Sequence, residues 1–188
     1  CLPGLLSASR ERQADVTEEL AQQVFEALEI LLAGFEAAAE RDGRELLDDA
    51  LARDDEHLYA GLLTVLLRLV FVLYAEDRGL LPVEHPFYAR HLSLLALFEE
   101  LQEDRDGYPD AMGQRFSAWG KLVALFRAIF EGANHADLDM PPRRGELFSP
   151  QRFPFLEGWG PAGGAPISSM EERAKVRLPT VDDGTVLG

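Results

Sequence analysis

The side chains most suited to chemistry are a histidine and two aspartates that alternate along one polar segment. His135, Asp137 and Asp139 could bind a divalent cation, because imidazole nitrogen and carboxylate oxygen are common ligands of such ions. Three candidate ligands from one segment are also typical of an ordinary solvated turn, which is the interpretation we favour. A small hydrolase or metalloenzyme is therefore a third alternative that depends on these residues alone.

A second set of candidate residues closes a stretch that is otherwise apolar. Glu76, Asp77 and Arg78 follow the run 62–75, in which Arg68 is the one charged residue. Arg68 lies eight residues before Glu76, on a similar helix face, and would need an acidic partner if it were buried. One interpretation is an allosteric or catalytic charge network. We favour the other, a structural ion network of these four residues that fixes the register of the helix.

A third set is basic, in a chain that is acidic overall. Arg143, Arg144 and the nearby Arg152 form a local cluster that could contact phosphate if a parent protein binds DNA, or could pair with acidic helices instead. The 188 residues include 18 Lys and Arg against 33 Asp and Glu, a net charge of −15. Such a surface repels a phosphate backbone on average. It suits a basic partner, mimicry of DNA or, as we favour, simple solvation.

The sequence contains none of the familiar loops of catalytic sites. The glycines of 158–166 lie among prolines, which is unlike a phosphate-binding loop, and no Gly-x-Ser-x-Gly element is present. We therefore expect no catalytic, cofactor-binding or metal-binding residue in this chain.

Composition also indicates the compartment. The single cysteine, Cys1, excludes an intrachain disulfide, which suits a reducing, cytoplasmic location. The uncharged runs on either side of Arg68 are shorter than the ~20 residues of a membrane span, and the first residues do not form a signal peptide. A start without Met suggests a chain cut from something longer.

Apolar residues at three- and four-residue spacing predict an all-α protein, an irregular bundle of four to six helices. An irregular lead-in over residues 1–14 precedes the bundle, 15–132. The first helix is expected from Asp15 or Thr17 to about Arg41. Its predicted buried face consists of Leu20, Val24, Ala27, Leu28, Leu31 and Phe35.

The central helix is expected around 62–75, because an apolar circumference indicates neighbours on all sides. Gly79 suits a left-handed residue just beyond its end. Further helices are predicted at about 44–52, 93–104 and 111–131, the last burying Met112, Phe116, Trp119, Val123, Phe126 and Phe130.

Residues 133–188 are rich in proline and glycine, so we expect an extended segment packed on the bundle. Its aromatic residues, among them Phe148, Phe153 and Phe155, are expected to fill gaps in the core. A short strand at Lys175–Leu178 is a candidate. Residues 182–187 resemble a capped helix that is just beginning.

Five segments carry a resemblance to a known family. They are LLRLVFVLYAEDRGLLP (66–82), Tyr88, SLLAL (93–97), LVALFRAIFEG (122–132) and GELFSPQRFPFLEG (145–158). In this order they resemble the helical region of bacterial restriction–modification and phage-defence proteins that carry an adenine-specific N6 DNA methyltransferase domain. The resemblance covers about residues 20–187.

The resemblance implies a position in a larger protein rather than a reaction. The family's methyl transfer needs an S-adenosylmethionine-binding glycine motif and an Asn-Pro-Pro-Tyr loop, and Met140-Pro141-Pro142-Arg143 lacks its Asn and its aromatic residue. No carboxylate and lysine cluster of a nuclease is present either. We expect a non-catalytic connector between methyltransferase and nuclease modules, which would bind S-adenosylmethionine and DNA themselves. The alternative is a free-standing acidic interaction module or DNA mimic.

Overall fold

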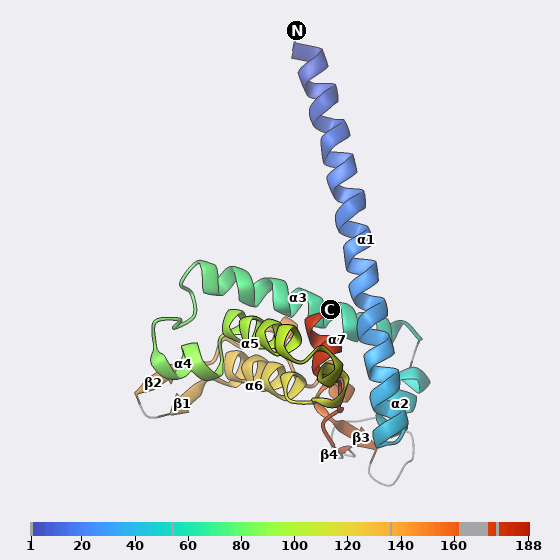
Figure 1. Ribbon diagram of the computed structural model, residues 1–188, viewed down its shortest axis with the longest axis vertical. Coiled ribbons are helices and arrows are strands. Elements are labelled where there is room, and N and C mark those ends of the chain that lie inside the picture. The colour runs from blue at the N-terminus through green and yellow to red at the C-terminus, as the bar shows by residue number, and fades with distance from the viewer. Residues whose placement is uncertain (1, 54, 136, 162–172, 176) are drawn as a thin grey trace.

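The computed structural model describes residues 2–53, 55–135, 137–161, 173–175 and 177–188, and it confirms the all-α class (Figure 1). The helices are α1 (Leu2–Asp42), α2 (Glu45–Arg53), α3 (Asp55–Asp77), α4 (Pro86–His91), α5 (Leu94–Gly107), α6 (Ala118–Glu131) and α7 (Asp183–Leu187). Short 3-10 turns are η1 (Pro109–Gln114), η2 (Glu146–Phe148) and η3 (Pro154–Glu157).

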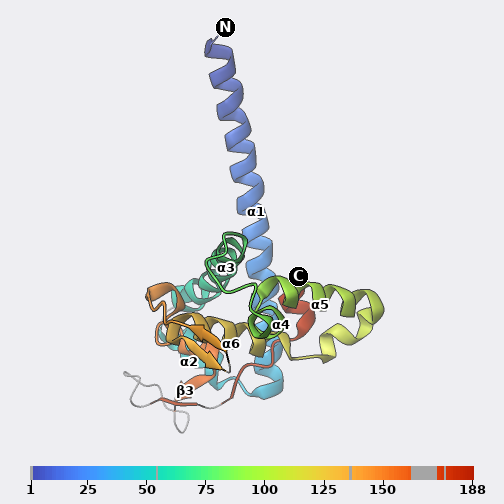
Figure 2. The same cartoon turned by 90° about the vertical axis from the view of Figure 1, so that its left-hand side faces the viewer.

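The first helix is longer than its apolar pattern predicts. α1 begins at Leu2, so the expected irregular lead-in over 1–14 is helical instead. No proline or glycine lies between Leu5 and Thr17, so nothing in the sequence ends a helix there. At 1.5 Å per residue α1 is about 60 Å long. Its N-terminal part projects from the body in two perpendicular views (Figures 1 and 2).

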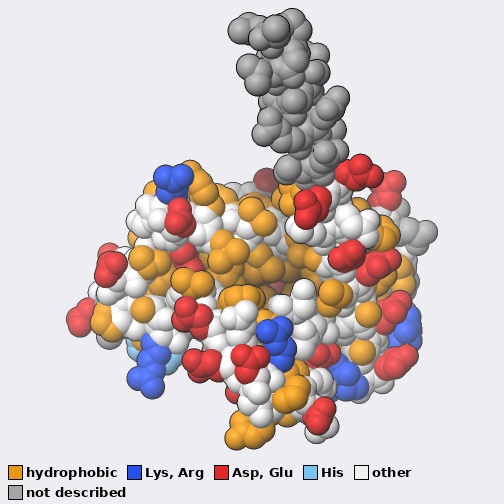
Figure 3. Space-filling model, turned by 45° about the horizontal axis from the view of Figure 1, so that its top comes forward, with side chains coloured by type: hydrophobic (Ala, Val, Ile, Leu, Met, Phe, Trp, Pro, Cys, Tyr) orange, Lys and Arg blue, Asp and Glu red, His pale blue; other side chains and the backbone are white. Residues whose placement is uncertain are grey.

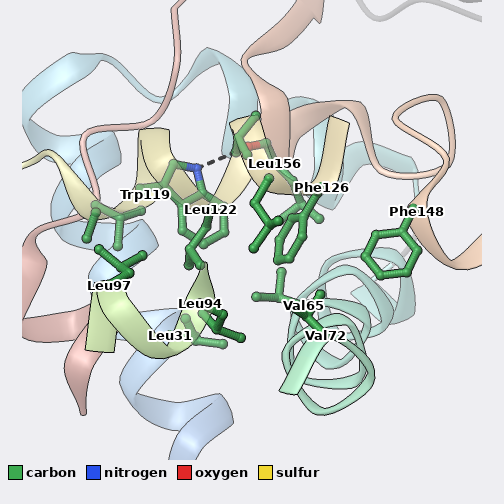
Figure 4. Close-up of a cluster of buried hydrophobic side chains, with 14 of the residues drawn as sticks. Leu31, Val65, Val72, Leu94, Leu97, Trp119, Leu122, Phe126, Phe148 and Leu156 are labelled. Carbon is green, nitrogen blue, oxygen red and sulfur yellow. Dashed lines mark hydrogen bonds between the residues drawn. The ribbon is translucent and has the colours of Figure 1, made fainter. Parts of the chain in front are cut away.

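The core forms where the C-terminal half of α1 meets α3, α5 and α6. Leu28, Leu31 and Phe35 of the predicted face are buried, and the Phe35 ring meets Trp119 edge-on, with centroids 5.0 Å apart. Figure 4 shows these helices converging around Trp119 and Leu122. Leu20, at the start of the predicted face, is exposed because α1 has left the body at that level.

α3 is not surrounded by neighbours, which corrects the sequence-based expectation. Its inner face is buried at Leu62, Val65 and Val72. Its outer face is also apolar, yet it is exposed at Leu67, Val70, Phe71, Leu73 and Tyr74. An apolar circumference therefore indicates here one face in the core and one face that stays largely exposed.

By length and composition α3 could also cross a membrane, and in the described part of the chain it is the one helix that could. Core helices of soluble proteins pass the same test, and 44% of its most apolar window is buried inside this fold.

The predicted helix at 111–131 is interrupted. η1 and α6 replace it, and Phe116 between them is exposed. The Asp183 carboxylate accepts hydrogen bonds from the Ala118 amide (2.8 Å) and the Ser117 hydroxyl (3.1 Å). Because this residue is 65 positions along the chain, local spacing could not indicate that α6 begins at Ala118.

The C-terminal segment packs on the helices as expected, with additional structure. Phe148, Phe153 and Phe155 are buried. Two antiparallel strand pairs are present: β1 (Ala133–His135) pairs with β2 (Leu138–Met140), and β3 (Trp159–Pro161) pairs with β4 (Arg173–Lys175). Of the candidate strand at 175–178, Lys175 lies in β4, residues 177 and 178 are not in a strand, and residue 176 lies outside the described residues. The helix expected at 182–187 is α7, with Asp182 as its N-cap.

Candidate functional site

Arg68 is buried on the inner face of α3, with 2% of its surface exposed. Its Nε donates to the Leu147 carbonyl (2.6 Å) and its Nη2 to the Ser149 carbonyl (3.2 Å). The guanidinium also lies over the Phe126 ring, 5.2 Å from its centroid. Burial lowers the pKa of Arg68 to about 10, and the Glu157 carboxylate opposes that shift. Arg68 therefore joins α3 to the segment that contains η2.

Glu76 organises a second polar cluster at the end of α3. Its Oε1 accepts from the Tyr88 hydroxyl (2.9 Å) and the Leu94 amide (2.8 Å), and its Oε2 from the Leu95 amide (3.2 Å) and the Ser93 hydroxyl (3.5 Å). A carboxylate at the N-terminus of α5 is stabilised by the partial positive charge there. Burial, with the Glu76 charge and hydrogen bond, raises the pKa of Tyr88 well above its usual range.

The four residues of the predicted ion network have different partners. Among the described residues no hydrogen bond or ion pair joins Arg68 to Glu76, because Arg68 bonds carbonyls while Glu76 bonds the start of α5. Asp77 and Arg78 pair with each other at 3.6 Å on the exposed surface. Backbone carbonyls can satisfy a buried guanidinium, and this is why the expected acidic partner is not in contact with it.

Arg143 and Arg144 use their backbones to close the C-terminus of α6. Their amides donate to the Ile129 carbonyl (2.9 Å) and the Phe130 carbonyl (3.2 Å). The Arg143 side chain donates to the Leu80 carbonyl just beyond α3 (3.0 Å). These contacts tie together the ends of two helices, and a phosphate contact by either side chain stays a prediction.

Arg152 lies between η2 and η3 and contacts other residues than Arg143 and Arg144 do. Its guanidinium is 5.3 Å from the centroid of the Phe153 ring, a residue of the buried segment. The sequence cluster is thus divided between two structural positions.

The histidine and aspartates of the polar segment lie on the β1–β2 hairpin. His135 stacks on the Phe87 ring at 4.4 Å, and Asp139 pairs across the strands with Asn134. In the described ranges no group of three or more His, Cys, Asp or Glu side chains is placed to hold a metal ion. The interpretation of this segment as an ordinary solvated turn stays a prediction.

Two buried acids carry contacts that sequence reasoning missed. Glu157 is 2% exposed, and its Oε2 accepts from Arg127 Nε at 2.6 Å. Asp183 is 1% exposed and caps α6 from α7. Glu157 directly follows the apolar residues Phe155 and Leu156. A charge beside residues that are expected to be buried is the one feature of the sequence that could have indicated a buried acid. No local pattern in the sequence indicates the partner of Asp183.

A large apolar groove lies between α1, α3, α5 and α7, with a volume of about 410 Å³. Leucines supply most of its lining, together with Phe98 and the end of α7; the α3 and α5 lining residues are Leu66, Leu69, Leu73, Leu94, Leu95, Leu97, Phe98 and Leu101. Figure 3 shows hydrophobic side chains gathered in a hollow near the foot of α1, with acidic side chains on the surface around it.

Comparison with known proteins adds no relative. No protein family, no curated protein and no solved structure matches this chain.

Proposed function

We propose that this chain is a non-catalytic helical scaffold within a larger protein that resembles an adenine-N6 DNA methyltransferase of a restriction–modification or phage-defence system. Its role would be to hold the methyltransferase module, and a nuclease module where one is fused, at a fixed geometry in the cytoplasm. S-adenosylmethionine and DNA would be bound by those modules.

The observation that supports this proposal is that Arg68 and Glu76 bind other segments of the chain through hydrogen bonds. Glu76, from the segment 66–82, accepts hydrogen bonds from Tyr88 and from the start of the segment 93–97. Arg68, from the same segment, donates to carbonyls of the segment 145–158. Four of the five segments behind the resemblance are thereby held together by polar contacts to two side chains. Such contacts fix helices in place, which is a structural use of these two charges.

The fifth segment is joined to them by packing and by an ion pair. Phe126 of 122–132 lies under the Arg68 guanidinium, and Arg127 pairs with Glu157. A tightly packed core of this kind transmits a displacement rather than absorbing it, which suits a part that holds other domains in register.

The parent protein is tested by reading the gene on both sides of this chain. The proposal expects, downstream, a glycine-rich strand–helix turn followed by an Asn-Pro-Pro-Tyr motif. A flanking sequence with no such elements would overturn the parent assignment.

The non-catalytic role is tested with the purified chain. We expect no transfer of labelled methyl groups from S-adenosylmethionine to DNA, and no tight DNA binding at physiological salt, because the net charge is −15. Methyl transfer by this chain alone would contradict the scaffold function. A matched preparation of the parent protein is the positive control for the assay.

The alternative function, an acidic interaction module or DNA mimic, is favoured by one observation. The walls of the apolar groove carry many more acidic than basic residues. This alternative predicts association with a basic protein that weakens steeply as salt is raised, and a native gene product of about this length.

A further inference from the structure

The apolar groove has the form of a site that lacks its occupant. α3 contributes Leu66, Leu69 and Leu73, at the three- and four-residue spacing of one helix stripe, and α5 contributes a second stripe that includes Phe98. Leu73 is 46% exposed and Phe98 43% exposed, so large apolar side chains meet water there. Exposed apolar surface of this extent marks interaction sites.

The chemistry of the lining selects a helix as the occupant. Among the described lining residues the polar groups are the Thr185 hydroxyl and backbone at the end of α7. An extended peptide would bury backbone amides and carbonyls against leucines with no hydrogen-bond partners. A helix satisfies its own backbone and offers only side chains. A small ligand would find no convergent polar groups to orient it.

The acidic residues of α1 and α5, which form two walls of the groove, indicate that the bound helix has basic residues on either side of its apolar stripe. Beside Ala27 and Leu31, which line the groove, α1 carries the exposed Glu18, Glu19, Glu26 and Glu29 and no basic residue from position 18 to 31. α5 carries the exposed Glu99 and Glu103, whereas its Glu100, Asp104 and Asp106 pair with Lys121, Arg115 and Arg105. A second copy of this chain would bring like charges together, while a basic helix would meet complementary charge on both sides.

We propose that the groove between α1, α3, α5 and α7 binds an amphipathic helix of another protein or module, with an apolar stripe and flanking Lys and Arg residues. The recognition is of the helix-in-groove type, in which anchors three and four residues apart enter the apolar cleft. The inference deepens the scaffold function and rests on it, since a scaffold needs a surface that holds a second element.

The test uses fluorescent helical peptides and fluorescence anisotropy. The probe is a peptide of about 18 residues, five helical turns, with leucines on one face and lysines on both flanks. Two matched peptides replace the lysines by glutamates, or the leucines by alanines. The chain offers a matched pair of variants: Leu73→Asp in the groove and Leu67→Asp outside it, both leucines of α3 that are about half exposed.

The proposal expects the Leu/Lys peptide to bind and both other peptides to fail. Leu73→Asp should weaken that binding at least about tenfold, and Leu67→Asp less than about twofold, because anchors at the centre of an interface carry most of its affinity. Binding should weaken with salt. Circular dichroism of both variants shows whether the fold is retained, and Phe98→Ser replaces Leu73→Asp if that variant unfolds.

Three outcomes would overturn the proposal. Equal binding of the Leu/Glu peptide would remove the charge argument, and equal loss in both aspartate variants would place the peptide elsewhere. A concentration-dependent dimer, detected by sedimentation and abolished by Leu73→Asp, would make a second copy the occupant. Each result is independent of the scaffold function, which fails instead if the chain itself methylates DNA.

Discussion

The two faces of α3 are both apolar, but one face is buried in the core and the other is exposed. The inner face is buried at Val65 and Val72 and is anchored by Arg68, whose guanidinium bonds two carbonyls of the C-terminal segment. The outer face is as apolar, yet Leu67 and Val70 are exposed. The difference lies in what the rest of the chain places against each face, so composition shows that a helix can be buried and does not show on which side.

The largest expected effect comes from breaking the polar anchor of the inner face. Arg68→Ala leaves the Leu147 and Ser149 carbonyls without their donor and removes the contact with Phe126. We expect a loss of about 4 kcal/mol in the free energy of unfolding, measured by urea denaturation. The neighbouring Leu67→Ala should cost less than about 0.5 kcal/mol. Equal losses would mean that Arg68 is not an anchor.

A matched pair of valines two residues apart compares the faces directly. Val72 is 0% exposed and Val70 is 66% exposed on the same helix. Val72→Ala should cost about 2 kcal/mol of unfolding free energy, from lost burial plus a cavity. Val70→Ala should change it by less than about 0.5 kcal/mol, because little burial is lost. Similar values from thermal or urea unfolding would show that the outer face is covered in the folded chain.

A close approach on the inner face gives the next effect. A Cβ atom at Gly61 would lie 2.6 Å from the Phe155 ring, which fills the space beside α3. Gly61→Ala should therefore cost about 1.5 kcal/mol through overpacking. Gly107→Ala is the control, since nothing lies within 4 Å of a Cβ there. A neutral Gly61→Ala variant would show that the aromatic segment moves freely against α3.

The smallest effect is a titration at the end of α3. The raised pKa of Tyr88 means that the folded chain keeps this proton at pH values where an unfolded tyrosine, with a pKa of about 10, loses it. This contribution to stability is present below pH 10 and is lost as the pH rises further. Absorbance at 295 nm, which reports ionised tyrosine, should therefore show no contribution from Tyr88 near pH 10.

Tyr88→Phe is the control for that titration. It should leave the absorbance change near pH 10 unaltered, whereas a smaller change in the variant would mean that Tyr88 ionises there. The difference in unfolding free energy between the two proteins at one pH also removes the contribution of Arg68. The lowered pKa of Arg68, about 10, favours folding as the pH rises above that value.

Local patterns predicted the helices best where their start and stop signals are local. Ser93 caps α5, Asp182 caps α7, and Gly79 takes the expected left-handed conformation after α3. Prediction was poorest where a distant residue decides the boundary, as at Ala118, which is capped by Asp183. The short helix α4 was not predicted either; its N-cap is the His85 side chain, which accepts from the Phe87 amide.

The candidate site shows the same division. The sequence identified Arg68 and Glu76 as the unusual charges, because a charged group in or beside an apolar helix needs compensation. It could not identify their partners, since most are backbone groups, which every residue has, and the Tyr88 and Ser93 hydroxyls lie 12 and 17 residues from Glu76. The groove was not predicted at all, because its lining comes from five helices, α1, α3, α5, α6 and α7, that lie far apart in the sequence.

By itself, the sequence determined that the chain is helical, acidic and built around an apolar helix with Arg68 inside it, because spacing and composition act locally. Tertiary structure alone decided which face of α3 is buried, which face is exposed, and that Leu66, Leu69 and Leu73 border an open groove. It also decided that Glu76 and Asp183 cap helices distant from them in sequence. The physical reason is that burial and hydrogen-bond partners depend on which segments meet in space, and that is set by the packing of the whole chain.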